Sequence, residues 1–283
     1  MNRVLITGAG SYIGTHIAAH LSQYPDQFEV HELDVQKGLP KQAFSGFDTV
    51  IHVAGIAHRR ETEGSAALYQ AVNATLAVDA AKQAKLEGVK HFIFFSSMSV
   101  YGKVTGRIHA DTQPDPNTYY GQSKLAAEKG MASLADDKFR IATLRPPMIY
   151  GRGCRGNYPR LAQLACKLPV FPQVKNERSM LYIGTLCAFV QRLIESGKGG
   201  LYFPQNREYV NTARMVKAIA SCHGRSMVCV PGAGWLMRLL ESRVGMVGKV
   251  FGTLTYDQSM STAFADAGQM PFEETIRLTE EEA

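Results

Sequence analysis

The 283-residue sequence lacks the long apolar stretches and the cysteine patterns that mark membrane and secreted proteins. No apolar run approaches the roughly 20 residues that cross a bilayer, and the first run, residues 4–6, begins too near Met1 to leave room for a signal peptide. The five cysteines are scattered and form no Cys-x-x-Cys pair, which is typical of reduced thiols. We therefore expect a cytoplasmic protein with no membrane span.

Patterns that bind metals or nucleic acids are missing as well. The sequence has no His-Glu-x-x-His motif or other metal spacing, so we expect no metal. The net charge is +6, but no long basic run with interleaved aromatic residues indicates nucleic acid. Two basic clusters follow segments that should end at a ligand cleft: His58-Arg59-Arg60, and Arg152, Arg155 and Arg160. They favour an anionic small molecule as the partner.

Short apolar runs and amphipathic stretches alternate along the first half of the chain. The expected strands are residues 4–6, 28–33, 49–53, 91–95 and 139–144, and the expected helices are residues 12–23, 66–86 and 119–134. Strands separated by helices of this length pair in parallel through right-handed crossovers. The fold class is therefore α/β, a doubly wound, Rossmann-like parallel sheet with ligands at the carboxyl ends of its strands.

The pattern changes after residue 145. Residues 145–153 are rich in Pro and Gly and are expected to form a loop. The segments that follow are a helix (158–167), a strand leading into a helix (180–196), a strand (201–203), and then short helices with one strand (227–230). We predict a dinucleotide-binding domain of residues 1–150, to which 178–205 return. Residues 151–177 and 206–283 are predicted to form a smaller mixed α/β substrate lobe.

A glycine-bearing turn follows the first strand. Gly8, Gly10 and Gly14 allow backbone N–H groups and a helix N-terminus to meet a diphosphate, although their spacing is not the common Gly-x-Gly-x-x-Gly. Asp34 lies twenty residues after Gly14, at the end of the second strand. A carboxylate there hydrogen-bonds a ribose 2′-hydroxyl and repels a 2′-phosphate, which favours NAD over NADP. The alternative is that Asp34 is an ordinary turn residue.

Tyr120 and Lys124 form an i, i+4 pair on an expected helix, and Ser97 follows the strand 91–95. A tyrosine has a pKa of about 10, which a lysine ammonium and a positive nicotinamide ring lower. The Ser97 hydroxyl is placed to bond the substrate oxygen that gains or loses a proton. The alternative is that each motif arose by chance. A Tyr-x-x-x-Lys pair is then an amphipathic pair on a helix surface, and Ser96-Ser97 is only a turn at a strand end. Their order and spacing together favour hydride transfer at a carbon bearing an alcohol.

With these motifs the sequence resembles the extended short-chain dehydrogenase/reductase family, in its NAD-dependent nucleotide-sugar epimerase/dehydratase group. The matching segments are residues 7–14, 52–55, 73, 96–102, 120–124, 145–151 and 178–183, so the resemblance covers nearly the whole chain. It implies that Ser97, Tyr120 and Lys124 are catalytic. It implies that the NAD-binding site is lined by Gly8, Gly10, Ser11, Tyr12, Ile13, Gly14, Asp34, Val53, Ala54, Gly55, Asn73 and Pro147. Asn157 and Arg178 are implied to hold the diphosphate of a nucleoside-diphosphate sugar.

The sequence departs from the family pattern at several positions. Ser11 replaces the middle glycine of the turn, and Met148 stands where many members carry a substrate-binding asparagine. Only a short stretch separates Asp34 from residue 49, so the usual helix and strand are missing and the sheet is shortened after its second strand. No Asp-Glu pair follows the serine, which argues against a dehydratase.

The leading hypothesis is a nucleotide-sugar 4-epimerase that uses NAD to oxidise the sugar C4 transiently. The alternative is an NAD(P)H-dependent 4-keto-nucleotide-sugar reductase, which the same residues would serve. A non-catalytic NAD(P)-binding regulator is disfavoured because Tyr120 and Lys124 are both present. The apolar, basic residues 235–251 would suit membrane association, but a helix packed on its own core is the preferred interpretation. A homodimer through residues 66–86 and 119–134 is suggested by analogy alone.

Overall fold

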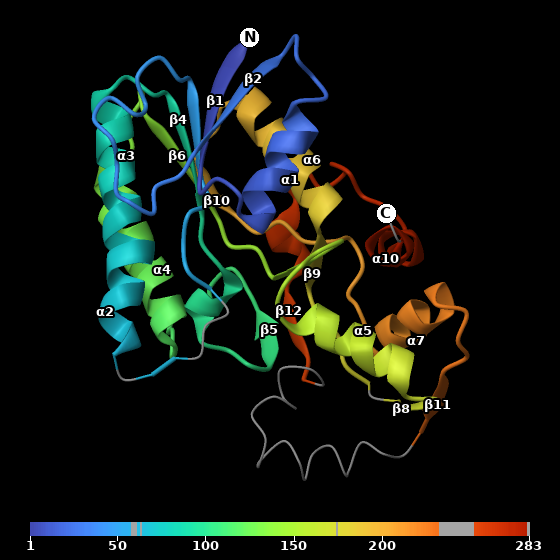
Figure 1. Ribbon diagram of the computed structural model, residues 1–283. Helices are drawn as coiled ribbons and strands as arrows, with labels where there is room; N and C mark the ends of the chain where they lie inside the picture. The colour runs from blue at the N-terminus through green and yellow to red at the C-terminus, as the bar shows by residue number, and fades with distance from the viewer. Residues whose placement is uncertain (58–60, 63, 174, 232–251, 282–283) are drawn as a thin grey trace.

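A computed structural model describes residues 1–57, 61–62, 64–173, 175–231 and 252–281 (Figure 1). A six-stranded sheet lies at its centre, and all of its strands are parallel. In spatial order the strands are β10 (Gly200–Tyr202), β6 (Arg140–Leu144), β4 (His91–Phe95), β3 (Thr49–His52), β1 (Asn2–Thr7) and β2 (Phe28–Leu33). Every residue of β3 and β4 is buried, as expected when helices cover both faces. The predicted doubly wound sheet is confirmed.

The strand order reverses at β1, which lies between β2 and β3. At such a switch point the loops that follow neighbouring strands diverge and leave a crevice for a ligand. Residues 34–48, all of them described, form turns and no strand, so β2 is an edge strand. Phe44 from this stretch is fully buried and packs against the core. The predicted shortening after the second strand is therefore confirmed.

Helices cover the two faces of the sheet (Figure 1). α1 (Tyr12–Leu21) and α6 (Ile183–Ser196) pack together on one face. On the other face lies a continuous helical run of α2 (Ser65–Tyr69), a π-helical turn (Gln70–Thr75) and α3 (Leu76–Leu86). It packs against α4 (Tyr119–Met131), which ends in a 3₁₀ turn (Ala132–Leu134). The long helices predicted at 66–86 and 119–134 are thus present, each with a local change of helix type.

A second apolar core lies at the lower right of Figure 1, away from the sheet. It is enclosed by α5 (Asn157–Lys167), α7 (Thr212–Cys222), α10 (Phe272–Glu280), β8 (Val170–Pro172) and β11 (Val228–Val230). Leu161, Val216 and Ile276 are among its buried residues. This core accounts for the expected mixed α/β lobe, while the exact division of the chain into two domains stays a prediction.

The main feature that the sequence analysis did not predict is a set of short strands, at residues 106–108, 148–150, 170–172 and 254–256. The loop expected at 145–153 contains β7 (Met148–Tyr150), which pairs in parallel with β9 (Met180–Tyr182). β5 (Gly106–Ile108) pairs with β12 (Leu254–Tyr256) in the same way. The prediction of an irregular loop was wrong at β7 because two prolines precede the strand and a glycine follows it, and both residue types suggest a break.

Two predicted features lie outside the described residues: the cluster His58-Arg59-Arg60 and the segment 235–251. In the described part of the chain, no helix is long and apolar enough to cross a membrane. The same part contains no group of three or more His, Cys, Asp or Glu residues that could hold a metal ion.

Candidate active site

The glycine turn after β1 is closely packed on one side and open on the other. Gly8 has φ +100°, and a Cβ there would lie 2.9 Å from the backbone nitrogen of Ala54. The Gly8 N–H donates to the Leu33 carbonyl at 2.9 Å, which fixes the end of β2 beside the turn. Gly10 has φ +71°, and nothing lies within 4 Å of its Cβ position. The turn therefore presents open backbone at Gly10, as close approach of a diphosphate requires.

Ser11, which replaces the middle glycine, is the N-cap residue of α1. Its φ of −74° is ordinary extended backbone, so serine is adopted without strain. Its hydroxyl accepts a hydrogen bond from the Gly14 N–H at 3.2 Å, and a Cβ on Gly14 would come within 2.7 Å of that oxygen. The serine hydroxyl thus provides a hydrogen-bond acceptor for one of the N–H groups that have no partner within the helix. The first-turn N–H groups of Tyr12 and Ile13, which have no partner within the helix, are left for an anion.

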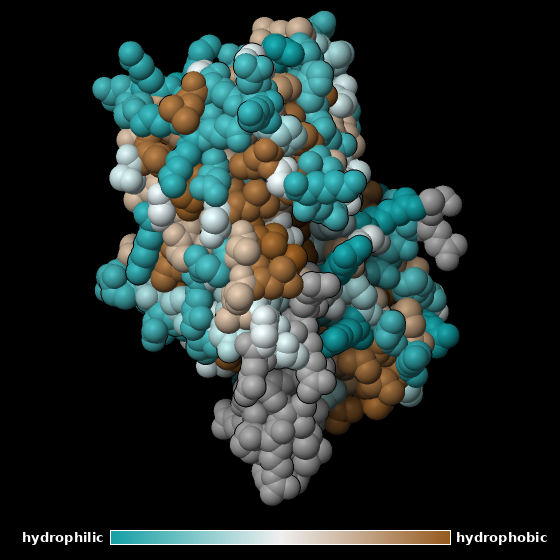
Figure 2. Space-filling view, turned by 60° about the vertical axis from the view of Figure 1, so that its left-hand side comes forward, coloured by the Kyte–Doolittle hydropathy of each residue, from teal (hydrophilic) through white to brown (hydrophobic). Residues whose placement is uncertain are grey.

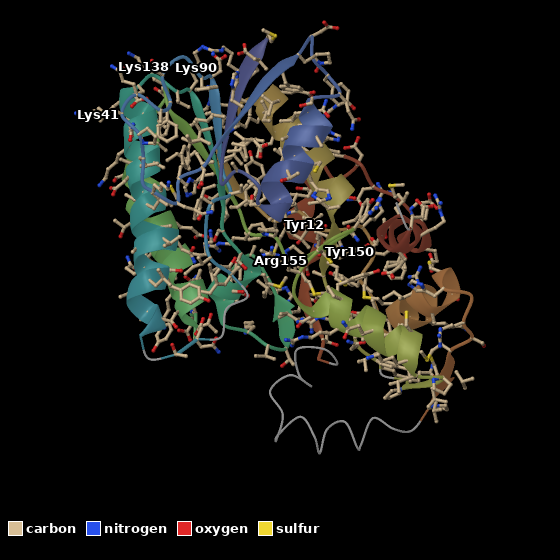
Figure 3. All side chains as sticks on the ribbon, viewed as in Figure 1. Tyr12, Lys41, Lys90, Lys138, Tyr150 and Arg155 are labelled. Atoms are coloured by element: carbon tan, nitrogen blue, oxygen red, sulfur yellow. The ribbon has the colours of Figure 1, made fainter. Side chains whose placement is uncertain are left out.

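The Tyr12 side chain points away from the glycine turn. It packs against both the sheet core and the second core, and Figure 3 shows Tyr12 and Tyr150 in the same region between them. Its hydroxyl is buried and has no hydrogen-bond partner among the described residues, and it lies 2.8 Å from the Cβ position of Gly151. Any contact of Tyr12 with a diphosphate would therefore involve its backbone. Asp34 is exposed after β2, and its carboxylate accepts from the Gln36 N–H at 2.8 Å, so it closes a turn beside the cofactor crevice.

The structure brings Ser97 and Tyr120 together. Ser97 begins a 3₁₀ turn (Met98–Tyr101) after β4, and Tyr120 lies in the first turn of α4. Burial raises the pKa of the Tyr120 phenol, and a hydrogen bond with the Ser97 side chain opposes that rise. Tyr69 from α2, 6.3 Å away between ring centroids, raises the pKa further. The phenol is therefore neutral by itself, and positive charge is needed for it to act as a base.

Lys124 is the buried positive charge of the site. Its side chain is 4% exposed, and its Nζ lies 4.9 Å from the centroid of the Phe94 ring. Burial lowers the pKa of Lys124 to about 8, and the nearby Glu128 carboxylate opposes that shift. Burial and the Lys124 charge lower the pKa of His52 to about 3, so this imidazole is neutral. Lys124 thus lies against the carboxyl ends of β3 and β4.

Asn73 fixes the turn that passes over Lys124. Its Oδ1 accepts from the Ile56 N–H at 2.8 Å, and its Nδ2 donates to the Ile56 carbonyl at 3.0 Å. Nδ2 also donates to the Ser123 hydroxyl on α4 at 3.1 Å. The π-helical turn that carries Asn73 is thereby tied to both β3 and α4. Contacts of NAD with Asn73, Val53, Ala54 and Pro147 stay predictions.

Gly55 leaves no room for a side chain in this turn. A Cβ there would lie 2.9 Å from the Asn73 Oδ1 and 3.3 Å from the Lys124 Nζ. We expect Gly55→Ala to displace the turn or the ammonium and to lower kcat by about 10²-fold, since a misplacement of about 1 Å can cost this much. Gly64→Ala is the matched control because nothing lies within 4 Å of its Cβ position. Steady-state kinetics and thermal unfolding of both variants test this; an unchanged kcat in Gly55→Ala would contradict it.

A buried ion pair beside Lys124 was missed by the sequence analysis. The Glu128 carboxylate accepts from Arg145 Nε at 3.0 Å and Nη2 at 2.5 Å, and from the Ser96 hydroxyl. Arg145 also donates to the Tyr101 hydroxyl at 2.8 Å. The sequence could have indicated Glu128 as a neighbour of Lys124, because it lies four residues later and thus on the same side of α4. The network connects that helix to the segments after β4 and β6.

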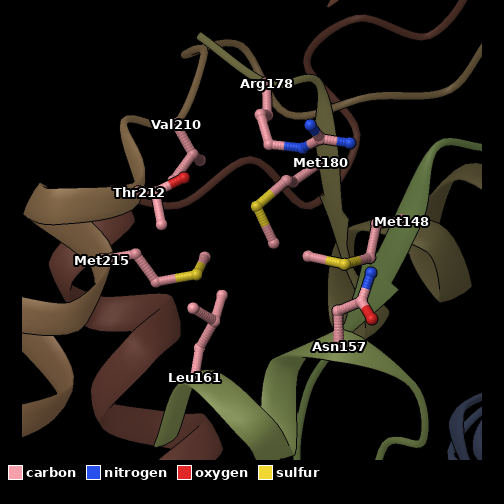
Figure 4. A pocket seen from close by; sticks show the side chains of 8 residues that line it. All are labelled: Met148, Asn157, Leu161, Arg178, Met180, Val210, Thr212 and Met215. Atoms are coloured by element: carbon pink, nitrogen blue, oxygen red, sulfur yellow. The ribbon is translucent and has the colours of Figure 1, made fainter. Parts of the chain in front are cut away.

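The predicted substrate residues line one pocket at the edge of the second core (Figure 4). Asn157 is the first residue of α5, and Arg178 precedes β9. Met148 lies between their side chains in Figure 4, so the residue that replaces the family's asparagine also lines the pocket. The other lining residues are Leu161, Met180, Val210, Thr212 and Met215. The structure thus brings together two polar groups that the sequence separates by 21 positions.

Arg178 is a half-buried cation. Its Nη1 donates to the Gly252 carbonyl at 2.8 Å, and burial lowers its pKa. Among the described residues no carboxylate forms an ion pair with it. A desolvated guanidinium in a pocket is suited to bind an anion such as a phosphate.

The sequence model of the NAD dependent epimerase/dehydratase family matches residues 4–202. The chain belongs to this NAD-dependent family. It is 28% identical over 287 residues to the UDP-glucose 4-epimerase of Vibrio cholerae, covering 90% of this chain and 87% of that one. It is 29% identical over 220 residues to the N-acetyl-alpha-D-glucosaminyl-diphospho-ditrans,octacis-undecaprenol 4-epimerase of Escherichia coli O157:H7, covering 70% of this chain and 65% of that one.

The fold agrees with solved structures of the family. UDP-glucuronic acid 4-epimerase from Bacillus cereus, in complex with NAD, superposes with a TM-score of 0.76 at 17% identity. The match covers 98% of this chain and 95% of the other. At this identity the likeness establishes the fold, and the residues of the present chain have to carry the functional argument.

Proposed function

We propose that this chain is an NAD-dependent nucleotide-sugar 4-epimerase that acts by transient oxidation at the sugar C4. The observation that carries the proposal is the pairing of Ser97 with Tyr120, beside the buried Lys124, at the carboxyl edge of the sheet. Both named sequence relatives are 4-epimerases, which supports C4 as the reacting carbon. The pocket of Asn157 and Arg178 supplies a site for the diphosphate.

In this proposal the side chains transfer the proton of the sugar C4 hydroxyl and hydrogen-bond the C4 oxygen. The Tyr120 phenolate takes the proton of the C4 hydroxyl, and the Ser97 hydroxyl donates a hydrogen bond to the same oxygen. The Lys124 ammonium stabilises the negative charge of the site, where low exposure makes its field strong. NAD, when bound, supplies the acceptor and later the donor of the C4 hydride. Tyr120 then returns its proton to the oxygen of the epimer.

The residues around the crevice fit NAD. The open backbone at Gly10 and the helix terminus at Tyr12 and Ile13 suit a diphosphate, and a side chain at Gly55 would fill the space above Lys124. The exposed Asp34 carboxylate suits a ribose 2′-hydroxyl and would repel a 2′-phosphate. A nucleoside-diphosphate sugar is the proposed partner. Homodimer formation, absence of nucleic-acid binding and cytoplasmic location stay predictions.

Arg178→Met is expected to weaken substrate binding more than turnover. Charge-assisted hydrogen bonds to phosphate contribute about 1.5–3 kcal/mol, so KM should rise by roughly 10–100-fold while kcat changes little. Arg192→Met is the matched control because Arg192 lies on α6 and is 60% exposed. Initial rates over a range of substrate concentrations separate the two constants. A KM for Arg178→Met equal to that of the control would remove Arg178 from the site.

The proposal is tested by proton NMR of the purified chain with NAD⁺ and a panel of UDP- and dTDP-hexoses. A C4 epimer that forms without net NADH, and that Tyr120→Phe slows by about 10²–10⁴-fold, would support it. If no epimer forms but a 4-keto nucleotide sugar drives NADH or NADPH consumption, the chain is a reductase and the proposal is wrong. Equal rates in Tyr120→Phe and the wild type would remove the assigned base.

A further inference from the structure

The small sheet of β8 and β11 has an apolar outer face. Among the described residues, five of the eleven exposed large hydrophobic side chains belong to this region: Leu164, Leu168, Val170, Val228 and Val230. Their exposures run from 39% to 56%. Figure 2 shows hydrophobic surface at the lower end of the molecule, at the level of β8 and β11 in Figure 1. We call these five residues the β8–β11 patch.

The patch is contiguous by strand register and helix spacing. Val170 pairs with Val228, and Pro172 with Val230, across the two parallel strands. Alternation along each strand turns Phe171 and Cys229 inward, where they pack on the second core, so the paired valines face outward. Leu164 and Leu168 are four residues apart at the end of α5 and lead directly into β8. Parallel strands are normally covered on both faces, and an uncovered apolar face is typical of an interaction surface.

The chain segments that form the β8–β11 patch contain no acidic residue, and the Glu280 carboxylate of α10 is hydrogen-bonded to His223. Residues 138–176 and 209–231, which contain α5, β8, α7 and β11, include no Asp or Glu. Lys167 precedes Leu168 directly, Arg225 lies three residues before Val228, and both are exposed. In the described part of the chain neither forms an ion pair within 4 Å, whereas Arg214 on α7 is held by Glu208 and Glu273. Within the described residues, the patch is therefore apolar and flanked by two cations, Lys167 and Arg225, that have no carboxylate partner.

We propose that the β8–β11 patch docks on an anionic lipid bilayer. Apolar side chains rimmed by Lys and Arg suit the boundary between acyl chains and negative headgroups, where both groups contribute to binding. α5 runs from Asn157 in the substrate pocket to Lys167 at the patch, and its 11 residues span about 16 Å. Docking thus holds the substrate pocket within reach of the headgroups.

The test is flotation of the full chain with phosphatidylcholine vesicles and with vesicles that also contain phosphatidylglycerol. We expect binding to the anionic vesicles, weaker binding to the neutral ones, and loss of binding as salt is raised. Val170→Ser combined with Val228→Ser should reduce anionic-vesicle binding at least about tenfold. Leu201→Ser is the matched control, because Leu201 is 45% exposed on β10 of the central sheet. Lys167→Gln combined with Arg225→Gln should flatten the salt dependence.

Other occupants of the patch give different results. Failure of the wild type to bind anionic vesicles at low salt overturns the proposal. If the chain's own segment 232–251 covers the patch, the double serine variant unfolds at a lower temperature and vesicle binding is unaffected, which also overturns it. A wild-type dimer that the double serine variant converts to monomer assigns the patch to a second copy instead. Epimerase activity on a water-soluble nucleotide sugar should be equal in all these variants, so failure of the proposed function remains separate from failure of docking.

Discussion

Replacing Lys124 with methionine is expected to abolish most turnover and, at neutral pH, to stabilise the fold. Lys124 is 4% exposed, and burial lowers its pKa from the usual 10.5 to about 8. A lysine with a lower pKa in the folded chain binds its proton more weakly there than in the unfolded chain. Below pH 8 the charged group therefore destabilises the fold by about 3 kcal/mol, from about 1.4 kcal/mol for each pKa unit.

The penalty from Lys124 depends on pH in a defined direction. Between pH 8 and 10.5 the unfolded chain holds more protons than the folded one, so wild-type stability rises with pH across this window. Methionine carries no charge and removes the penalty, but it also removes the cation–π contact with Phe94, worth roughly 0.5–2 kcal/mol. The net gain of about 1–3 kcal/mol at pH 7 corresponds to a Tm increase of roughly 2–6 °C.

Loss of the ammonium has the opposite effect on activity. It removes the buried positive charge one helical turn from Tyr120, and such electrostatic groups contribute about 10²–10³-fold to kcat. Lys129→Met is the matched control, since Lys129 lies on the same helix and is exposed. Thermal unfolding at pH 7 and pH 10, together with kcat at pH 7, tests both effects. A Lys124→Met chain that is less stable than the control at pH 7 would contradict the desolvation argument.

The central sheet could be predicted because its signal is local. β3 and β4 are short segments rich in β-branched and aromatic residues, and the helices between them have their own periodicity. β5 gives no such signal: Gly106 pairs with Leu254, and three residues that include a glycine carry no strand pattern of their own. β5 and β12 pair because the fold brings two distant segments together, which a single sequence does not encode locally.

The candidate site also has a part that could be predicted from the sequence and a part that could not. The spacing of Tyr120 and Lys124 on one helix could be read directly, and family resemblance placed Asn157 and Arg178 in one pocket. The hydrogen bonds of Asn73 to Ile56 could not be predicted, since they depend on how a π-helical turn packs on the end of β3. Side-chain pairing across elements is decided by tertiary packing, whereas motif spacing is decided along the chain.

Replacing Glu128 with glutamine is expected both to destabilise the fold and to shift the pH range of activity. The parallel pairing of β4 and β6 places the segments after them side by side, and Arg145 and Ser96 there both bond the Glu128 carboxylate. The Arg145 and Glu128 side chains are 8% and 11% exposed. Removing one partner of a buried pair costs about 3–5 kcal/mol, because the other charge is left unpaired.

The shift in activity arises through Lys124. The Glu128 charge raises the pKa of Lys124 against the effect of burial, so its removal lowers that pKa below about 8. Less of the lysine then carries a proton at pH 7–8, and the alkaline limb of the pH–rate profile moves to lower pH. Recording kcat/KM against pH for the wild type and Glu128→Gln gives this displacement directly. Asp136→Asn serves as control, since the exposed Asp136 lies beyond the helix and pairs with Lys85.

The double variant Glu128→Gln with Arg145→Met separates the two effects of Glu128. With both charges removed, no buried ion is left unpaired, so most of the lost stability should return. The alkaline limb should stay displaced, because the carboxylate that supports the Lys124 ammonium is still missing. If the double variant regained the wild-type pH profile along with its stability, Glu128 would act only through the packing of Arg145. If the limb stays displaced in a stable chain, Glu128 tunes the charge of Lys124 and so sets the pH at which the Ser97–Tyr120 pair can work.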